Sequence, residues 1–179
     1  MKDNRYIFTS ERLGFRNFEE SDLDEMLELN QDPQVMLFFP SVQDKITTKS
    51  FIERMQLEYS EYKYCYFAVE LKTSSEFLGF IGISNQDYGD ELGKFVDVGW
   101  RVKQSAWGNG YATEGAKQCL LYAKEELKLP KVYAVAPEIN VNSIAVMEKI
   151  GMKKVREFEH PKLIDFPDIK DCVLYEINL

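Results

Sequence analysis

Gln104–Glu114 reads QSAWGNGYATE, with Gly108 and Gly110 placed between a strand-like run and a long helical pattern. Glycines let the backbone approach a ligand closely and point several N–H groups at one place. The helix that follows adds about half a positive charge at its first turn. The segment therefore predicts a pyrophosphate cradle. Two glycines also occur in ordinary tight turns, and the segment lacks the third glycine of a dinucleotide fingerprint and the Lys-Ser/Thr of a P-loop.

The residues on either side of this segment form a strand, a helix and a second strand. Phe95–Val102 alternates between an apolar face and a mixed face that holds Asp97, Gly99 and Arg101. After Gly110, apolar residues recur at helical spacing from about Ala112 to Leu127, and Pro130 ends the pattern. Lys131–Ala136 then reads as a strand. Such a crossover connects strands that lie parallel.

The remaining patterns complete a mixed α/β domain. An initial strand and two amphipathic helices precede three strands with short connections, which indicates an antiparallel meander. The expected helices are Ser21–Gln31, Thr48–Glu61 and Asn140–Ile150, and the further strands are Tyr64–Leu71, Phe77–Ser84, Lys153–Glu159 and Asp171–Asn178. The order is βααβββαβαββ, and the length of 179 residues fits one domain over residues 1–179.

Charge and cysteine content bound the function. The chain has 22 basic and 30 acidic residues, a net charge of -8, which argues against a nucleic-acid partner. An acidic surface attracts amines, or simply keeps the protein soluble. The three cysteines are Cys65, Cys119 and Cys172. They are widely spaced, so we expect buried thiols in a reducing compartment.

Metal and membrane sites are not expected. The single histidine, His160, and the lack of a ligand cluster argue against zinc. Residues 1–13 contain no apolar leader, and the most apolar stretch, Phe77–Ile83, is far shorter than the ~20 residues of a membrane span. We therefore expect a cytoplasmic protein without membrane contact.

A second pair of motifs strengthens the interpretation of the cradle. Asn140–Ser143 reads NVNS and Val146–Met152 reads VMEKIGM. With Gln104–Glu114, they make the chain resemble the GCN5-related N-acetyltransferase (GNAT) superfamily, specifically the branch of ribosomal-protein N-terminal alanine and serine acetyltransferases. The resemblance covers nearly the whole chain and includes Glu11–Leu13, Asp32–Met36, Gly99–Trp100, Glu157–Pro161 and Val173–Tyr175.

The resemblance implies a mostly antiparallel sheet with a central, splayed parallel strand pair and helices on both faces. It implies that acetyl-coenzyme A binds as co-substrate between the strand ending at Val102 and the strand beginning at Lys131. Backbone groups of the first strand would bind the pantetheine arm, and loop N–H groups the pyrophosphate. The implied binding residues are Trp100, Arg101, Val102, Trp107, Gly108, Asn109, Gly110, Tyr111, Ala112, Asn140 and Ser143.

The sequence departs from the family pattern at two positions. Ser105 stands where Gln or Arg is frequent, which concerns one side-chain contact in the cradle. Met147 stands where many members carry a Tyr that protonates the departing thiolate. Asn140 and Ser143 are the matching candidates for that role, and the branch points to the Ser143 hydroxyl, with a bound water as the alternative donor. Both residues are also favoured as helix caps.

Other site residues follow from the same resemblance. Glu159 and His160 would face the acceptor as candidate bases, although His160 precedes Pro161 and is equally typical of a turn. We interpret Glu114 as structural. Trp100 and Trp107 are interpreted as packing residues rather than a stacking box. The segment Phe38–Pro40 is expected to wall the acceptor pocket and to set specificity.

The acceptor is expected to be a primary α-amine. Deprotonation at pH 7 costs about 1 kcal/mol for an α-amine and about 4.6 kcal/mol for a lysine-like amine. We therefore expect the acceptor to be a protein N-terminus or a small molecule with an α-amine. We expect the acetyl group to pass to it directly, in a ternary complex. The alternatives are a polyamine, free amino acid or drug amine as acceptor, or a non-catalytic coenzyme A binding module, which Met147 makes plausible. The protein is expected to be a monomer or a homodimer.

Overall fold

The computed structural model describes residues 5–89 and 93–179. Strands in these ranges form an eight-stranded sheet in the order β1-β2-β3-β4-β5-β6-β8-β7. The strands are β1 (Phe8–Thr9), β2 (Leu13–Arg16), β3 (Tyr66–Leu71), β4 (Phe77–Asp87), β5 (Lys94–Val102), β6 (Lys131–Pro137), β7 (Lys153–Glu159) and β8 (Asp171–Asn178). Neighbours are antiparallel except β5 and β6. The predicted mixed α/β fold with a parallel pair is confirmed.

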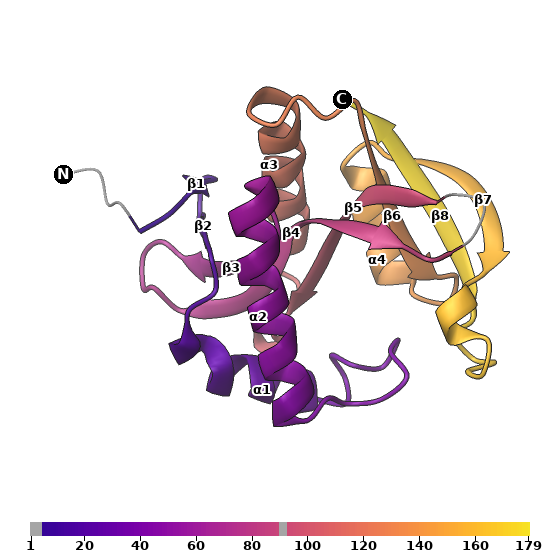
Figure 1. Cartoon of the computed structure of the whole chain (residues 1–179), viewed down its shortest axis with the longest axis horizontal. Helices are drawn as coiled ribbons and strands as arrows, with labels where there is room; N and C mark the ends of the chain where they lie inside the picture. The colour runs from indigo at the N-terminus through magenta and orange to yellow at the C-terminus, as the bar shows by residue number, and fades with distance from the viewer. Residues whose placement is uncertain (1–4, 90–92) are drawn as a thin grey trace.

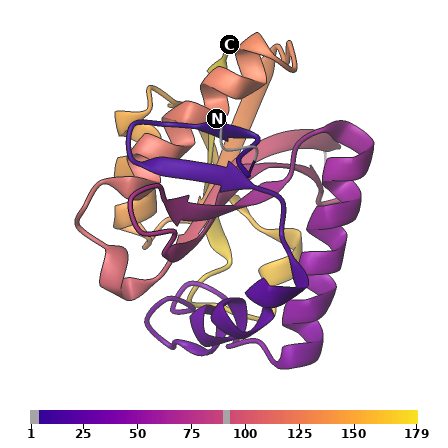
Figure 2. The same ribbon diagram turned by 90° about the vertical axis from the view of Figure 1, so that its left-hand side faces the viewer.

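Four α-helices in the described ranges cover the two faces of the sheet. They are α1 (Leu23–Gln31), α2 (Lys45–Tyr62), α3 (Tyr111–Glu125) and α4 (Val141–Lys149). Figure 1 places α2 in front of the strands and α3 behind them. The turned view in Figure 2 has α2 on one side of the sheet and α3 on the other. Helices on both faces therefore match the expectation.

The chain begins with a hairpin where a single strand was predicted. β1 and β2 pair antiparallel, and Ser10 N donates to Leu13 O at 2.9 Å across the turn. β1 has only two residues, too few to show an alternating pattern. The expectation about a leader rests partly on residues 1–4, which lie outside the described residues.

Three further boundaries differ from the prediction. α1 begins at Leu23 because Glu20–Asp22 form a 3-10 turn. α2 begins at Lys45 because the Asp44 carboxylate accepts a hydrogen bond from Thr47 N at 2.8 Å and caps the helix earlier. β4 continues to Asp87 because it pairs with β5 from Gly79 to Asp87. The other helix and strand ends differ from the expected ones by no more than two residues.

The parallel strands β5 and β6 meet at one residue pair. Asp97 lies opposite Tyr133, and no further pair joins the two strands in the described chain. Beyond this point β5 continues to Val102 on β4, whereas β6 pairs along its length with β8. One edge of β5 is therefore left without a neighbouring strand, and the predicted splay is confirmed.

The core forms on both sides of the central strands. Cys65, Cys119 and Cys172 are all buried and free, as predicted. Burial raises the pKa of Cys172 to about 12, so it remains a thiol at neutral pH.

Among the described helices, none is long and apolar enough to cross a membrane.

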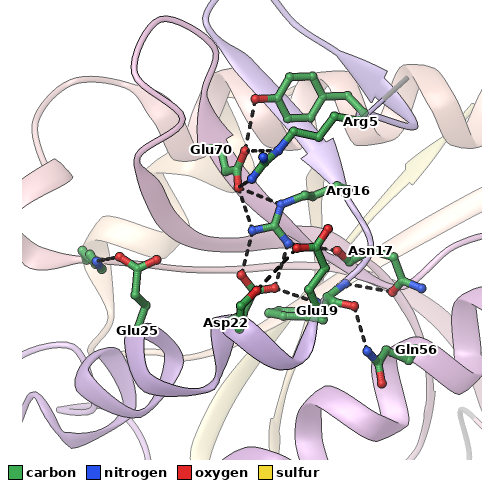
Figure 3. A network of polar contacts seen from close by, with 12 residues as sticks. Arg5, Arg16, Asn17, Glu19, Asp22, Glu25, Gln56 and Glu70 are labelled. Atoms are coloured by element: carbon green, nitrogen blue, oxygen red, sulfur yellow. Dashed lines mark hydrogen bonds and ion pairs between the residues drawn. The ribbon is translucent and has the colours of Figure 1, made fainter. Parts of the chain in front are cut away.

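A buried ionic network ties the first helix to the sheet (Figure 3). Arg16 on β2 donates to the carboxylates of Glu70 on β3 and Asp22, each bond 2.7 Å long. The three side chains are at most 5% exposed. Burial raises the pKa of Glu70, but hydrogen bonds from Arg5 and Arg16 outweigh burial, and the net pKa is lowered. The network thus positions α1 beside the sheet.

We expect Glu70→Gln to lower the free energy of unfolding at pH 7 by about 3 kcal/mol, because it leaves buried Arg16 without one of its charge partners. The lowered pKa of Glu70 sets the pH dependence. Its contribution is present above the unfolded pKa of about 4.3 and disappears as pH falls through the lower folded value. Urea unfolding at pH 7 and in acid measures both effects.

Glu53→Gln is the matched control, because Glu53 pairs with Lys49 at 3.7 Å and is 61% exposed. It should change the free energy of unfolding by less than about 0.5 kcal/mol. Equal effects of the two variants would contradict the role given to the network.

Candidate functional site

A cleft of about 880 Å³ opens where β5 and β6 separate. Its walls come from segments far apart in sequence: the loop after α1, strands β4 and β5, the start of α3, the end of β6, and α4. The splay therefore creates a concave site between the two halves of the sheet, as expected for a small-molecule pocket. Among the described residues, no cluster of three or more His, Cys, Asp or Glu side chains could hold a metal ion.

The loop before α3 has the geometry of an anion cradle. Gly108 and Gly110 both have φ of 78°, a conformation that glycine adopts without strain. A Cβ on Gly108 would meet nothing within 4 Å, so the backbone faces open space there. Gly110 is the N-cap of α3 and supplies no side-chain cap, so the first N–H groups of the helix stay available to a ligand.

Glu114 braces this loop from behind. Its carboxylate accepts hydrogen bonds from Ser10 Oγ at 2.6 Å, and from Arg12 N and Nε at 2.8 and 2.6 Å. Arg12 Nη2 in turn donates to Asn109 O at 3.0 Å. The Asn109 side chain bonds two carbonyls of its own loop, and Asn109 is not among the residues that line the cleft. Because the Glu114 carboxylate is fully engaged by Ser10 and Arg12, Glu114 is structural, as interpreted. The sequence analysis did not predict the contact between Glu114 and Arg12.

The last residues of β5 line the cleft along the free strand edge. Trp100, Arg101 and Val102 all contribute, as do Trp107 and the residues from Gly110 to Ala112. Trp100 packs against the core, which agrees with its interpretation. Trp107 is not a core packing residue, contrary to its interpretation, because its side chain is 47% exposed. Its Nε1 donates a hydrogen bond to Val102 O, at the end of β5, at 2.9 Å.

The start of α4 forms the opposite wall. The Asn140 side chain accepts from Ser143 N at 3.2 Å, so Asn140 caps the helix, and both residues line the cleft. The Ser143 hydroxyl forms no hydrogen bond within the described part of the chain, and so remains free to act on a ligand. Met147, also at the cleft, is 2% exposed and offers no proton donor.

The structure separates the two expected bases. His160 lines the cleft and is 9% exposed. Its Nδ1 accepts from Lys162 N at 3.1 Å, and its ring lies 4.3 Å from that of Tyr88. The Glu159 carboxylate instead pairs with Lys170, is 56% exposed, and is not a lining residue. Of the pair, only His160 reaches the site.

Asp97 is a cleft residue that sequence reasoning missed. It is 7% exposed and accepts hydrogen bonds from Tyr66 Oη at 2.6 Å and Gln86 Nε2 at 3.2 Å. Burial raises the pKa of Asp97 to about 7, against the opposing effect of these two hydrogen bonds. A carboxyl that titrates near neutral pH in a cleft is a candidate acid or base. The available signal was an acidic residue flanked by the apolar residues Val96 and Val98 in the strand.

Arg101 reaches the cleft with its side chain, not only with its backbone. It is 9% exposed, and its Nη1 donates to Asn30 Oδ1 at 2.6 Å. The ring of Phe39 lies 4.2 Å from its guanidinium. The segment Phe38–Pro40 lines this part of the cleft, where the sequence placed the acceptor wall.

Comparisons with known proteins agree with this architecture. A family model described as an acetyltransferase (GNAT) domain matches residues 12–153. The uncharacterized protein YkkB of Bacillus subtilis is 32% identical over 156 residues, which cover 85% of this chain and 90% of that protein.

Solved structures share the same fold. The crystal structure of a GNAT-family acetyltransferase from Bacillus anthracis is 29% identical, covers 95% of this chain and 96% of that one, and has a TM-score of 0.77. RimL, a ribosomal L7/L12 α-N-protein acetyltransferase, is 14% identical with a TM-score of 0.76, and each chain is 97% covered. The match of the family model over most of the sequence shows that this chain belongs to the GNAT acetyltransferase family.

Proposed function

We propose that the protein is an N-acetyltransferase that moves an acetyl group from acetyl-coenzyme A directly to a primary amine in a ternary complex, with an α-amine as the preferred acceptor. One observation carries the proposal. The same cleft combines the free N-terminus of α3, which suits a pyrophosphate, with a buried carboxyl, Asp97, whose pKa is raised to about 7.

The residues present fit acetyl-coenzyme A. The N–H groups from Trp107 to Ala112 would hold the pyrophosphate at the start of α3. The free edge of β5 from Trp100 to Val102 would bind the pantetheine arm as an added strand. When bound, the coenzyme supplies an activated acyl thioester.

Asp97 is proposed as the base that takes a proton from the acceptor ammonium. Its pKa of about 7 suits proton transfer at neutral pH. Tyr66 and Gln86 orient the carboxylate through their hydrogen bonds. His160 is the second candidate because it lines the same cleft, whereas Glu159 is paired with Lys170 outside it.

The Ser143 hydroxyl is proposed as the group that donates a proton to the departing thiolate. It lines the cleft at the start of α4, where Asn140 fixes the helix end. Met147 has no proton to give. The amine nitrogen would bond to the acetyl carbon as the C–S bond breaks, so no covalent enzyme intermediate is required. Ser143 would pass its hydroxyl proton to the thiolate and regain one from solvent, and Asp97 would return its proton to solvent.

A thiol-release assay tests the function. We expect coenzyme A to appear only when both acetyl-coenzyme A and an amine are present, and faster with free α-amines than with N-α-acetyl-lysine or spermine at pH 7, because deprotonating an α-amine costs less. Thiol release without an amine would indicate a hydrolase. Acetyl-coenzyme A binding without release for any amine would indicate a binding module, and faster reaction with spermine would overturn the choice of acceptor.

We expect Gly110→Val to weaken acetyl-coenzyme A binding at least about tenfold, measured by calorimetry, because a side chain at this positive φ distorts the loop that faces the ligand. Gly151→Val is the control. Gly151 also has a positive φ, 90°, so a valine there causes similar backbone strain. It does not line the cleft, so the substitution should leave coenzyme binding unchanged. Unchanged affinity in Gly110→Val, or equal losses in both variants, would contradict the cradle.

The pH dependence identifies the base. We expect kcat/KM to fall as pH drops through about 7, because Asp97 then becomes protonated and cannot accept a proton. Asp97→Asn should lower kcat/KM by about 100-fold or more and remove this limb, leaving only the titration of the amine. His160→Gln and Glu159→Gln should keep the limb. If the limb disappeared in His160→Gln or in Glu159→Gln but stayed in Asp97→Asn, the substituted residue, not Asp97, would be the base.

A further inference from the structure

Within the described part of the chain, the guanidinium of Arg101 is buried in the cleft without an anionic partner. It is 9% exposed, and its Nε has no hydrogen-bond partner among the described residues. No carboxylate in residues 5–89 or 93–179 forms an ion pair with it. Burial lowers the pKa of Arg101 to about 10, which leaves it charged at neutral pH. A buried charge without a partner weakens the fold unless a ligand supplies the partner.

Neighbouring groups hold Arg101 in place, and its Nε and Nη2 have no hydrogen-bond partner among the described residues. Asn30 accepts from Nη1 and is itself fixed by donating to Thr48 Oγ1 at 3.0 Å. The rings of Phe39 and Phe80 lie 4.2 and 5.3 Å from the guanidinium. The unused donors are Nε and Nη2, the edge of an arginine that binds a carboxylate through two parallel hydrogen bonds.

The charges around the cleft favour an anionic ligand. Its lining includes the cations Arg54, Arg101, Lys149 and Lys162, and Asp97 is the single carboxylate among the described lining residues. The whole protein has a net charge of -8, so the cleft is locally opposite in sign. Such a lining attracts anions and repels a polycation such as spermine. Phosphates of the coenzyme belong at the start of α3, which leaves Arg101 without a role in holding them.

Asp97 and Arg101 share one face of β5, because strand residues with even spacing point the same way. Their Cα atoms are about 13 Å apart along the strand. Tyr66, which bonds Asp97, stacks on Phe80 at 5.2 Å, and Phe80 lies beside the Arg101 guanidinium. The two rings span the distance between the carboxylate and the guanidinium. An acceptor that carries both an ammonium and a carboxylate can contact both side chains, because they lie on the same face of β5 and the arginine side chain reaches several ångströms.

We infer that the acceptor is an amino acid or short peptide whose free carboxylate binds the Nε and Nη2 edge of Arg101 while its α-amine faces Asp97. This inference rests on the proposed function and adds the substrate class to it. Asp97 then contacts the ammonium of the acceptor, and Arg101 binds its carboxylate. The rings of Tyr66 and Phe80 pack against the rest of the acceptor. Asp97 and Arg101 each gain an ion-pair partner, which neither has among the described residues.

Matched pairs of acceptors test the inference. We compare kcat/KM for phenylalanine and alanyl-phenylalanine with the values for their carboxamides. Wild-type protein should prefer the carboxylates at least about tenfold, mainly through KM. The α-amine of a carboxamide is less basic and reacts more readily at neutral pH, so this preference would oppose intrinsic reactivity. A ratio near one, a preference for carboxamides, or spermine as the best acceptor would overturn the inference.

Variants assign the preference to Arg101. Arg101→Met should bring the carboxylate-to-carboxamide ratio close to one, and Arg101→Lys should keep part of the preference because it keeps the charge. Lys49→Met is the matched control: it removes one positive charge from an exposed position on α2 outside the cleft, and the ratio should not change. An unchanged ratio in Arg101→Met would overturn the inference.

A binding measurement on wild-type protein does not depend on the folding of the variants or on turnover. With coenzyme A present, N-acetyl-phenylalanine should raise Tm, and N-acetyl-phenylalaninamide should not. Equal shifts would overturn the inference. Acetylation of carboxylates and carboxamides at equal rates would keep the proposed function and remove the role of Arg101. If N-acetyl-phenylalanine alone raised Tm and the protein acetylated no amine, the proposed function would be wrong and the binding of a carboxylate by Arg101 would stand.

Discussion

β5 and β6 run parallel but are joined at one residue pair, Asp97 and Tyr133, and the site follows from this constraint. A parallel connection requires a crossover, so α3 starts where β5 ends, and its N-terminus lies at the mouth of the gap. The strands diverge beyond the pair, which frees the edge of β5 from Val98 onward. The uncapped N-terminus of α3, the free strand edge and the cleft are therefore consequences of one topological feature, and Glu114 and Arg12 only fix the loop that precedes α3.

Local patterns were enough to predict the crossover, and long-range packing was needed for the rest of the site. The glycines before α3 and the pattern after them lie within one segment, so the sequence predicts the cradle directly. The sequence places Asp97 only on a mixed strand face, and it predicts coenzyme binding by the backbone of Arg101 without a role for its side chain. Their environment depends on α1 and α2, which cover that face with Asn30, Phe51 and other residues distant in sequence. No pattern within β5 reports what covers it.

The final hairpin illustrates the same limit at adjacent positions. Glu159 and His160 are neighbours in sequence, but only His160 lines the cleft. Glu159 is the last residue of β7, and its register opposite Asp171 brings Lys170 within reach of its carboxylate. His160 begins the following turn, which redirects the chain toward the cleft. The register of β7 on β8 is set by the whole sheet, so the motif alone could not separate the two residues.

The buried charges of β5 are costly to the folded protein itself. Because burial raises the folded-state pKa of Asp97 to about 7, unfolding becomes easier as pH rises from about 3.9, its unfolded value, toward neutrality. Arg101 also destabilises the folded state at neutral pH, since burial lowers its pKa to about 10, but this cost does not change between about pH 3.9 and 7. The two groups form no ion pair with each other. A neutral residue at either position would serve stability better, and the proposed acceptor, which would carry the complementary charges, would give both residues a function.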